Sequence, residues 1–323
     1  MRSLRLLSLF LAAAALAALP LHATETGTFE RTLQVSGAVD LDVISGSGNV
    51  KVHVGGNNSV RVYATIRARD SWFGLSAQEK IKRLQSNPPI EQQGNSIHVG
   101  RIEDRELQQN VSIDYDVTVP AQTKVMAQTG SGDQVIDGVQ LSVNAHTGSG
   151  NITVTNVAAG ARVRAGSGNL RLSNVNGSLD GETGSGNIRA NGIAGDVTVN
   201  TGSGEIDVEQ VARGNVRASA GSGNVKLHGV KGGLRAETGS GNVTVDGEPN
   251  GDWRVGAGSG NIDLRVPSNA SFNLNAHTSS GRLTVNRQVT MQGTFSRNRV
   301  QGKVGNGGVL LDLHTGSGDI QIN

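Results

Sequence analysis

The residues best suited to chemistry in this sequence are a few acidic and histidine side chains. Asp40 and Asp42 stand two residues apart, as do Asp114 and Asp116. In an extended strand this spacing puts both carboxylates of a pair on one face, where a hard cation could bind them. The simpler interpretation is a solvated strand face, so we expect no metal site here.

Three imidazoles occupy one position, two residues before a turn motif: His146, His277 and His314. This position points to solvent in the pattern described below, and His146 lies far from the other two in the chain. We therefore expect no joint metal site from these histidines.

Three arginines fall four residues before consecutive turn motifs: Arg217, Arg235 and Arg254. Stacked copies would bring their side chains about 5 Å apart, and like charges across strands are unfavourable. One interpretation is a row of solvated arginines, neutralised locally by Glu237. The other is a contact for an anionic ligand, such as an acidic polysaccharide or a lipid phosphate, which guanidinium groups bind well.

Two of the few aromatic residues, Trp72 and Phe73, stand beside a candidate helix. One interpretation is that they pack this helix onto the rest of the fold. The alternative is an exposed contact for a partner or a membrane surface.

We expect no catalytic residues, no cofactor site and no metal site from the sequence motifs. No glycine turn is followed by Lys-Ser/Thr and a helix, as a phosphate loop requires. Calcium-binding β-rolls need regular aspartates that these turns lack. The rival class is a β-helical polysaccharide lyase or hydrolase, which needs clustered acids and bases on one outer sheet. The repeat position of Trp253 points inward, so it offers no sugar platform.

These side chains are positioned by a repeat. The first residue of each Gly-Ser-Gly is 46, 130, 148, 166, 184, 202, 221, 239, 258 and 316, and Ser279-Ser280-Gly281 is a worn copy. The spacing of 18 or 19 residues between positions 130 and 258 is typical of a solenoid.

Apolar and polar residues alternate on both sides of the turn motif, as in Ile152–Thr155 and Val143–Thr147. This period of two predicts two half-buried strands in each coil, with a corner near Val157 that could count as a third. We expect the glycines to supply positive φ at the corner. We expect the asparagine that follows most copies to bond along the stack.

The remainder of the chain is a leader and an N-terminal region. Residues 1–23 have a basic start, a short apolar run and a small residue suited to cleavage, as in a signal peptide. No later stretch is apolar enough for a transmembrane segment. We expect residues 24–126 to form an N-terminal β region with a helical insertion at about 75–86, where Ser76 and Glu79 form a capping box. We expect residues 127–323 to form the β-solenoid repeats.

Charge and cysteine content exclude other classes. The chain has 29 Lys+Arg and 27 Asp+Glu, and the leader contains Arg2 and Arg5, so the mature balance is near zero. A general nucleic-acid binder needs a large positive surface, so we expect no nucleic acid partner. The chain has no Cys, so packing and backbone hydrogen bonds alone must hold the fold.

The Thr/Ala-Gly-Ser-Gly-Asn-Val/Ile-x-Val repeats, Val266-Pro267 and the closing Thr315–Ile320 resemble the bacterial putative-adhesin domain of unknown function. They are also similar to auto-transporter adhesin head-GIN domains. The resemblance covers nearly all of the mature chain. It implies a right-handed β-solenoid (β-helix) at the cell envelope, and no catalytic residues.

We therefore expect an all-β parallel solenoid with 18–19 residues per coil. We expect a non-enzymatic, exported protein that presents a rigid surface, as an adhesin or binding scaffold. Its location would be the periplasm, the cell surface or the medium, and it would need no cofactor. Its partner would be an anionic polysaccharide or another envelope or surface component.

Overall fold

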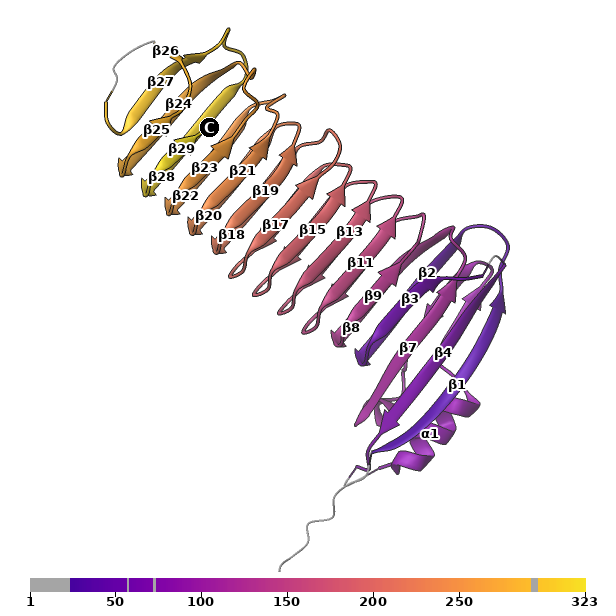
Figure 1. Cartoon of the computed structure of the whole chain (residues 1–323). Helices are drawn as coiled ribbons and strands as arrows, with labels where there is room; N and C mark the ends of the chain where they lie inside the picture. The colour runs from indigo at the N-terminus through magenta and orange to yellow at the C-terminus, as the bar shows by residue number, and fades with distance from the viewer. Residues whose placement is uncertain (1–23, 57, 72–73, 292–295) are drawn as a thin grey trace, which may run out of the picture.

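The computed structural model describes residues 24–56, 58–71, 74–291 and 296–323 of the chain, so the expected leader and Trp72-Phe73 lie outside them. Two long sheets face each other along a rod (Figure 1). No helix in these described ranges is long and apolar enough to cross a membrane. The all-β parallel solenoid expected from the repeat is confirmed.

Hydrogen-bonded neighbours follow one another along each sheet, from the N-terminal end of the rod in the first sheet and from the C-terminal end in the second. The 14-stranded sheet contains β1 (Glu25–Gln34), β4 (Ser59–Ala68), β7 (Val111–Val119), β3 (Val50–Val54), β9 (Gln134–Asp137), β11 (Ile152–Val157), β13 (Leu170–Val175), β15 (Ile188–Ile193), β17 (Ile206–Gln210), β19 (Val225–Val230), β21 (Val243–Gly247), β23 (Ile262–Arg265), β29 (Ile320–Ile322) and β25 (Leu283–Val285). The 15-stranded sheet contains β26 (Val289–Met291), β27 (Arg299–Val304), β24 (Phe272–Ser280), β28 (Leu310–Ser317), β22 (Trp253–Ser259), β20 (Leu234–Ser240), β18 (Val216–Ser222), β16 (Val197–Thr201), β14 (Leu179–Thr183), β12 (Ala161–Ala165), β10 (Val143–Thr147), β8 (Thr123–Ser131), β2 (Val39–Ser47), β6 (Ser96–Val99) and β5 (Ile90–Gln93).

Each coil contributes one strand to each sheet, and the turn motif joins the two. Strand β10 pairs in parallel with β12, one repeat later, and β11 pairs with β13 in the same way. Val157 is the last residue of β11 and faces the core. The corner near Val157 is therefore the end of the second strand of its coil and not a third strand.

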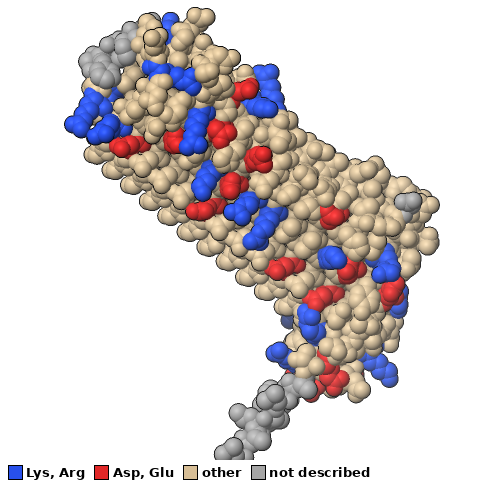
Figure 2. Space-filling view, viewed as in Figure 1, with Lys and Arg blue, Asp and Glu red and all other residues tan. Residues whose placement is uncertain are grey.

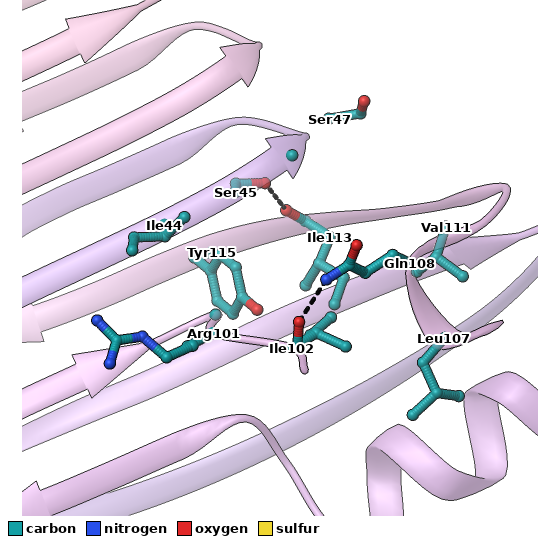
Figure 3. Close-up of a pocket in the computed structure, with 12 residues that line it drawn as sticks. Ile44, Ser45, Ser47, Arg101, Ile102, Leu107, Gln108, Val111, Ile113 and Tyr115 are labelled. Atoms are coloured by element: carbon teal, nitrogen blue, oxygen red, sulfur yellow. Dashed lines mark hydrogen bonds between the residues drawn. The ribbon is translucent and has the colours of Figure 1, made fainter. Parts of the chain in front are cut away.

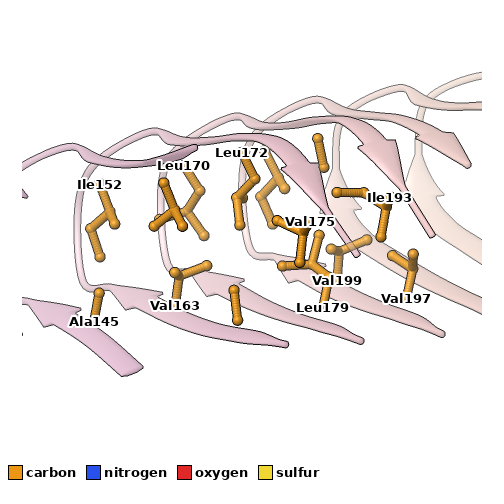
Figure 4. Packing of buried hydrophobic residues seen from close by; sticks show 14 of the residues in the cluster. Ala145, Ile152, Val163, Leu170, Leu172, Val175, Leu179, Ile193, Val197 and Val199 are labelled. Carbon is orange, nitrogen blue, oxygen red and sulfur yellow. The ribbon is translucent and has the colours of Figure 1, made fainter. Parts of the chain in front are cut away.

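The core is a thin layer between the sheets (Figure 4). Ile152, Leu170 and Leu172 of one sheet pack against smaller residues of the other, such as Ala145 and Val163, and all five are at most 1% exposed. Burying such a Val, Leu or Ile side chain contributes about 1.5–3 kcal/mol, so the stacked columns can hold the rod without disulfides.

The expected positive φ occurs at the third motif position of the later coils, in Gly223, Gly241, Gly260 and Gly318, with φ between 143° and 159°. The earlier corner glycines have a different reason. Gly186 and Gly204 do not have positive φ. Instead, a Cβ on Gly186 would lie 1.9 Å from the carbonyl oxygen of Gly168 in the neighbouring coil. The same contact recurs along the stack, so glycine is required because successive backbones pass too close for any side chain.

The asparagines after the turn motif do bond along the stack, as expected. Asn151 Oδ1 accepts hydrogen bonds from the backbone N–H of Asn169 at 3.1 Å and from its side-chain amide at 3.1 Å. Asn169 Oδ1 accepts the Asn187 N–H in the same way, at 3.0 Å. This side-chain ladder adds a bond at each corner to those of the backbone.

The N-terminal end is built on the first repeat copy. Strands β2 and β3 stack directly on β8 and β9. Between β3 and β8 the chain forms β4 to β7, of which β6 and β7 pair in parallel with β2 and β3, while β4 and β5 are antiparallel to their neighbours. Figure 1 shows α1 (Ala77–Ser86) lying against β1 and β4. Ser76 caps α1 by accepting the Glu79 N–H, and a short helix, α2 (Arg105–Gln108), precedes β7.

The C-terminal coils are stacked out of chain order. Strand β28 lies between β22 and β24, and β29 lies between β23 and β25. The copy at residue 279 is therefore the outermost, and the closing copy at 316 is inside it. As a result, Ile320 and Ile322 of the inner copy are fully buried, while Leu283 and Val285 of the outer copy are only partly buried.

Candidate functional site

The three arginines that the sequence singled out lie in register on neighbouring strands. Arg217 of β18 pairs with Arg235 of β20, and Arg235 pairs with Arg254 of β22. Adjacent strands are about 4.8 Å apart, so the row is about 10 Å long. All three residues are exposed on the outer face of the 15-stranded sheet.

Two of these arginines have acidic partners. The Arg235 guanidinium lies 2.8 Å from Glu237, and that of Arg254 lies 3.4 Å from Asp312 on the next strand. Arg217 forms no ion pair within the described ranges. Local neutralisation therefore covers one end of the row and leaves the positive charge of Arg217 at the other.

A shallow depression borders the unneutralised end of the row. It has a volume of about 370 Å³ and is lined by Thr198, Arg217 and Arg235 together with Asp196, Val197, Asn215, Val216, Gly233 and Leu234. Asp196 is engaged there, because its carboxylate accepts the Asn215 N–H at 2.7 Å. The arginines thus flank a polar hollow in which an anionic group could contact two guanidinium groups.

Earlier rungs of the same sheet are balanced. Arg162 lies 2.8 Å from Asp180, and Arg164 lies 3.2 Å from Glu182, each across one rung. On the face seen in Figure 2, basic and acidic side chains are likewise interspersed. The row at 217, 235 and 254 is therefore a local departure from an otherwise mixed surface.

The two carboxylate pairs each face basic side chains. Asp40 lies 3.6 Å from Lys124 and Asp42 lies 3.2 Å from His98. In the second pair, Asp114 contacts Arg67, and Asp116 lies 3.1 Å from His53 and 3.7 Å from Lys51. No group of three or more potential metal ligands occurs in the part of the chain that the structure describes.

The three repeat histidines are not brought together. His277 and His314 are neighbours in register on β24 and β28, while His146 lies on β10, many strands away. The ring of His314 lies over Gly256, where an added Cβ would be 2.6 Å from Nε2.

The aromatic candidates have different outcomes. Trp253 is fully buried, as its repeat position indicated, and its indole N–H donates to the Gly232 carbonyl at 2.8 Å. Trp72 and Phe73 lie outside the described residues, so their role as a contact stays a prediction.

A pocket that the sequence did not indicate lies at the N-terminal end of the core (Figure 3). It has a volume of about 410 Å³ and is lined by Ile44, Ser45, Gly46, Ser47, Gly100, Arg101, Ile102, Leu107, Gln108, Val111, Ile113 and Tyr115. It forms because β6 pairs with β2 only from Asp40 to Val43, and the chain returns to the end of β2 only at β7, where the Ser45 hydroxyl donates to the Ile113 carbonyl at 3.0 Å. The segment around α2 covers this gap loosely.

Tyr115 is the unusual polar group of this pocket. The residue is 2% exposed, and its hydroxyl has no hydrogen-bond partner. Burial raises the pKa of Tyr115 well above its ordinary value, so the hydroxyl keeps its proton and remains a donor. Tyr115 faces inward because apolar and polar residues alternate along Val111–Val119, but nothing in the sequence shows that the space beside it is open.

Comparison with solved structures finds similar chains of low identity. A putative adhesin from Parabacteroides merdae is 10% identical, with a TM-score of 0.33, and the match covers 92% of this chain and 96% of that one. One from Parabacteroides distasonis is 12% identical, with a TM-score of 0.32, over 92% and 97%. One from Bacteroides fragilis is 12% identical, with a TM-score of 0.28, over 92% and 97%. No curated protein matches.

The family model described as Toastrack DUF4097 matches twice, over residues 34–194 and 162–323. Together these two matches span the first repeat copy to the last residue, including the coils that are stacked out of order. On this evidence the chain belongs to the Toastrack family of domains of unknown function.

Proposed function

We propose that this protein is a non-enzymatic, exported scaffold that binds a surface or envelope component through the outer faces of its sheets. The observation that carries the proposal is the register: exposed side chains repeat at every rung along two long sheets held by continuous backbone ladders. Such a surface is preorganised, so binding a long, repetitive ligand orders few side chains. An adhesin is one protein of this kind.

The rival proposal, a polysaccharide lyase or hydrolase, has less support. Such chemistry needs a carboxylic acid or base that is free to exchange protons with the substrate. The paired carboxylates Asp40/Asp42 and Asp114/Asp116 are each engaged by basic side chains instead. Absence of product from uronic-acid polymers incubated with the protein is the expected result.

For the ligand we propose an anionic polysaccharide that contacts the row of Arg217, Arg235 and Arg254. Arginine forks bind carboxylate and sulfate groups through paired hydrogen bonds. The unneutralised Arg217 and the adjacent hollow favour this end of the row as the first contact. The aromatic pair Trp72 and Phe73 is a second candidate contact.

The test is binding of the mature protein to anionic glycans at low and moderate salt. Replacing all three arginines of the row by Gln should abolish binding. The matched control is the double variant Arg162→Gln, Arg164→Gln, which removes two exposed arginines from balanced rungs of the same sheet. Equal losses in the two variants, or no binding by the wild-type protein, would refute the role of the row.

Export is tested separately. Cell fractionation with surface protease treatment should place the mature chain outside the cytoplasm and distinguish periplasm from cell surface. Recovery of the full precursor in the cytoplasm would contradict the proposed location.

A further inference from the structure

A second shallow groove lies on the outer face of the 15-stranded sheet, beside the arginine row. The hollow described above borders the row on the side where the strands begin, and this groove borders it on the side where they end. It has a volume of about 570 Å³ and runs from Ser219 on β18, past Glu237 on β20 and Gly256 on β22, to His314 on β28. The arginine row therefore has a depression on each side.

Gly256 opens this groove because it takes the place of an outward side chain. It stands two residues after Arg254, in register with Glu237 on one side and His314 on the other. Every other residue of this column, from His146 on β10 to His314 on β28, has a side chain. Since neighbouring strands are about 4.8 Å apart, the gap between Glu237 and His314 spans about 10 Å of the sheet.

The His314 imidazole forms part of the floor of the groove. Its ring leans over Gly256, where an added Cβ would lie 2.6 Å from Nε2 and 2.7 Å from Cε1. Ligand sites combine an apolar or aromatic surface with a few polar groups, and the face of this ring supplies such a surface. The ring and the bare backbone of Gly256 can together seat one sugar ring.

The polar groups of the groove complement those of the arginine row. Glu237 uses Oε1 for its ion pair with Arg235, at 2.8 Å. Its other oxygen can accept from a ligand hydroxyl, as can the Ser219 hydroxyl on the next strand. The arginines lie two residues back along the same strands, about 7 Å away. The groove therefore favours a ligand with hydroxyl groups at one end and an anionic group at the other.

A hexuronic acid has this arrangement, because its ring has a carboxylate on one side and hydroxyl groups on the other. A densely sulfated sugar has anionic groups in place of some of these hydroxyls. Such a group beside Glu237 would oppose two negative charges. Repulsion of this kind is one way in which a binding site rejects the wrong ligand.

We infer that the groove selects uronic-acid polysaccharides, and that one sugar ring packs over Gly256 against His314. Hydroxyl groups of this ring donate to Glu237, and its carboxylate contacts Arg235 and Arg254. The inference rests on the function proposed above, since it names the class of polysaccharide and the residues that recognise it.

The test compares three polymers by calorimetric titration with the full mature protein at low salt. Polygalacturonate has a carboxylate on every ring, dextran sulfate is densely sulfated, and dextran has no charge. We expect polygalacturonate to bind more tightly than dextran sulfate, and dextran not to bind.

Two variants locate the selectivity. Gly256→Val places a side chain in the groove, where it meets the movable ring of His314, and should raise the Kd for polygalacturonate about tenfold. Glu237→Gln keeps the shape of the side chain and removes its charge. The ratio of the Kd for dextran sulfate to that for polygalacturonate should then fall about tenfold.

The matched control is Asn200→Val, which introduces the same side chain in the same column but outside the groove. It should bind both charged polymers as the wild-type protein does. A melting temperature close to that of the wild type shows that each variant is folded, and the Glu237→Gln result does not depend on how Gly256→Val folds.

Failure of the groove and failure of the arginine row give different results. If the triple arginine variant loses polygalacturonate, while Gly256→Val and Glu237→Gln bind both charged polymers as the wild type does, the row stands and the groove inference is wrong. Tighter binding of dextran sulfate than of polygalacturonate by the wild type also overturns the inference. If neither charged polymer binds, the function proposed above fails, and this inference fails with it.

Discussion

Replacing Gly186 by Ala tests the claim that close stacking, and not backbone conformation, requires glycine at the corners. The added Cβ would lie 1.9 Å from Gly168 O and 2.5 Å from Gly168 C. Ordinary non-bonded contacts are about 3.5 Å, so the two coils would have to separate locally by more than about 1 Å.

That separation would stretch the bonds of the corner. Gly184 N donates to Ala165 O at 3.2 Å and to Gly166 O at 3.1 Å, and Thr183 Oγ1 donates to Gly168 O at 2.8 Å. Losing two such bonds costs about 1 kcal/mol each, and overpacking adds about 1–3 kcal/mol. We expect Gly186→Ala to lower the free energy of unfolding by about 3–5 kcal/mol.

The assay is urea denaturation followed by circular dichroism, with Gly46→Ala as the matched control. Gly46 is the first glycine of its motif and has open space where its Cβ would be. Gly46→Ala should be neutral or stabilise by up to about 1 kcal/mol, because the unfolded chain loses freedom. If Gly186→Ala unfolds at the same urea concentration as Gly46→Ala, the stacking argument is wrong.

Three further predictions concern buried polar and aromatic side chains. Trp253→Ala should lower the free energy of unfolding by about 3–5 kcal/mol in denaturant titrations, because the indole is fully buried and bonded to Gly232 O; a smaller loss than that of an exposed control such as Tyr63→Ala would contradict the packing. Gln134→Leu should be neutral or stabilise the fold by about 1 kcal/mol in the same titration, because Gln134 interrupts an apolar column with a buried side-chain oxygen that has no partner. A clear loss of stability would show that the hydrogen bonds from its amide to Thr129 Oγ1 and His146 O outweigh that cost. Lys80→Met should speed amide hydrogen exchange across α1, because the buried ammonium donates hydrogen bonds to Ser71 Oγ and Gln109 O at 2.8 Å each. Unchanged exchange would mean that apolar packing alone holds the helix in place.

The coil could be predicted because each copy of the repeat has the same pattern of apolar, polar and glycine residues. The alternation around Ile152 and Val143 assigned both strands, and the spacing of the motifs assigned the register that aligns Arg217, Arg235 and Arg254. Periodicity of this kind depends only on neighbouring residues, so it can be read without a structure.

Features that depend on contacts distant in the chain were not predictable. A glycine looks the same in sequence whether it supplies positive φ or avoids a neighbouring carbonyl, so the expected positive φ occurs at Gly260 and not at Gly186. The pocket beside Tyr115 arises because β6 stops short of the end of β2, and strand length at an insertion is not encoded in the repeat.

The order of the C-terminal coils likewise could not be read from the repeat. The copies at 279 and 316 match the same pattern, so either could follow the copy at 258. Their order is set by contacts between strands distant in the chain, which exist only in the assembled rod.

This order has a consequence for how the rod is completed. Strand β24 leaves the ribosome, and any export channel, before β28, yet β28 occupies the place beside β22. While the last residues are missing, β24 and β22 carry matching motifs and can pair with each other, as both later pair with β28. Folding of this end must then either wait with β24 unpaired or undo that early pairing to admit β28 and β29. The final strands therefore complete the C-terminal end of the rod. A chain cut before Leu310 should still form the long middle of the rod, but with β24 paired directly with β22, an arrangement that the complete chain does not have.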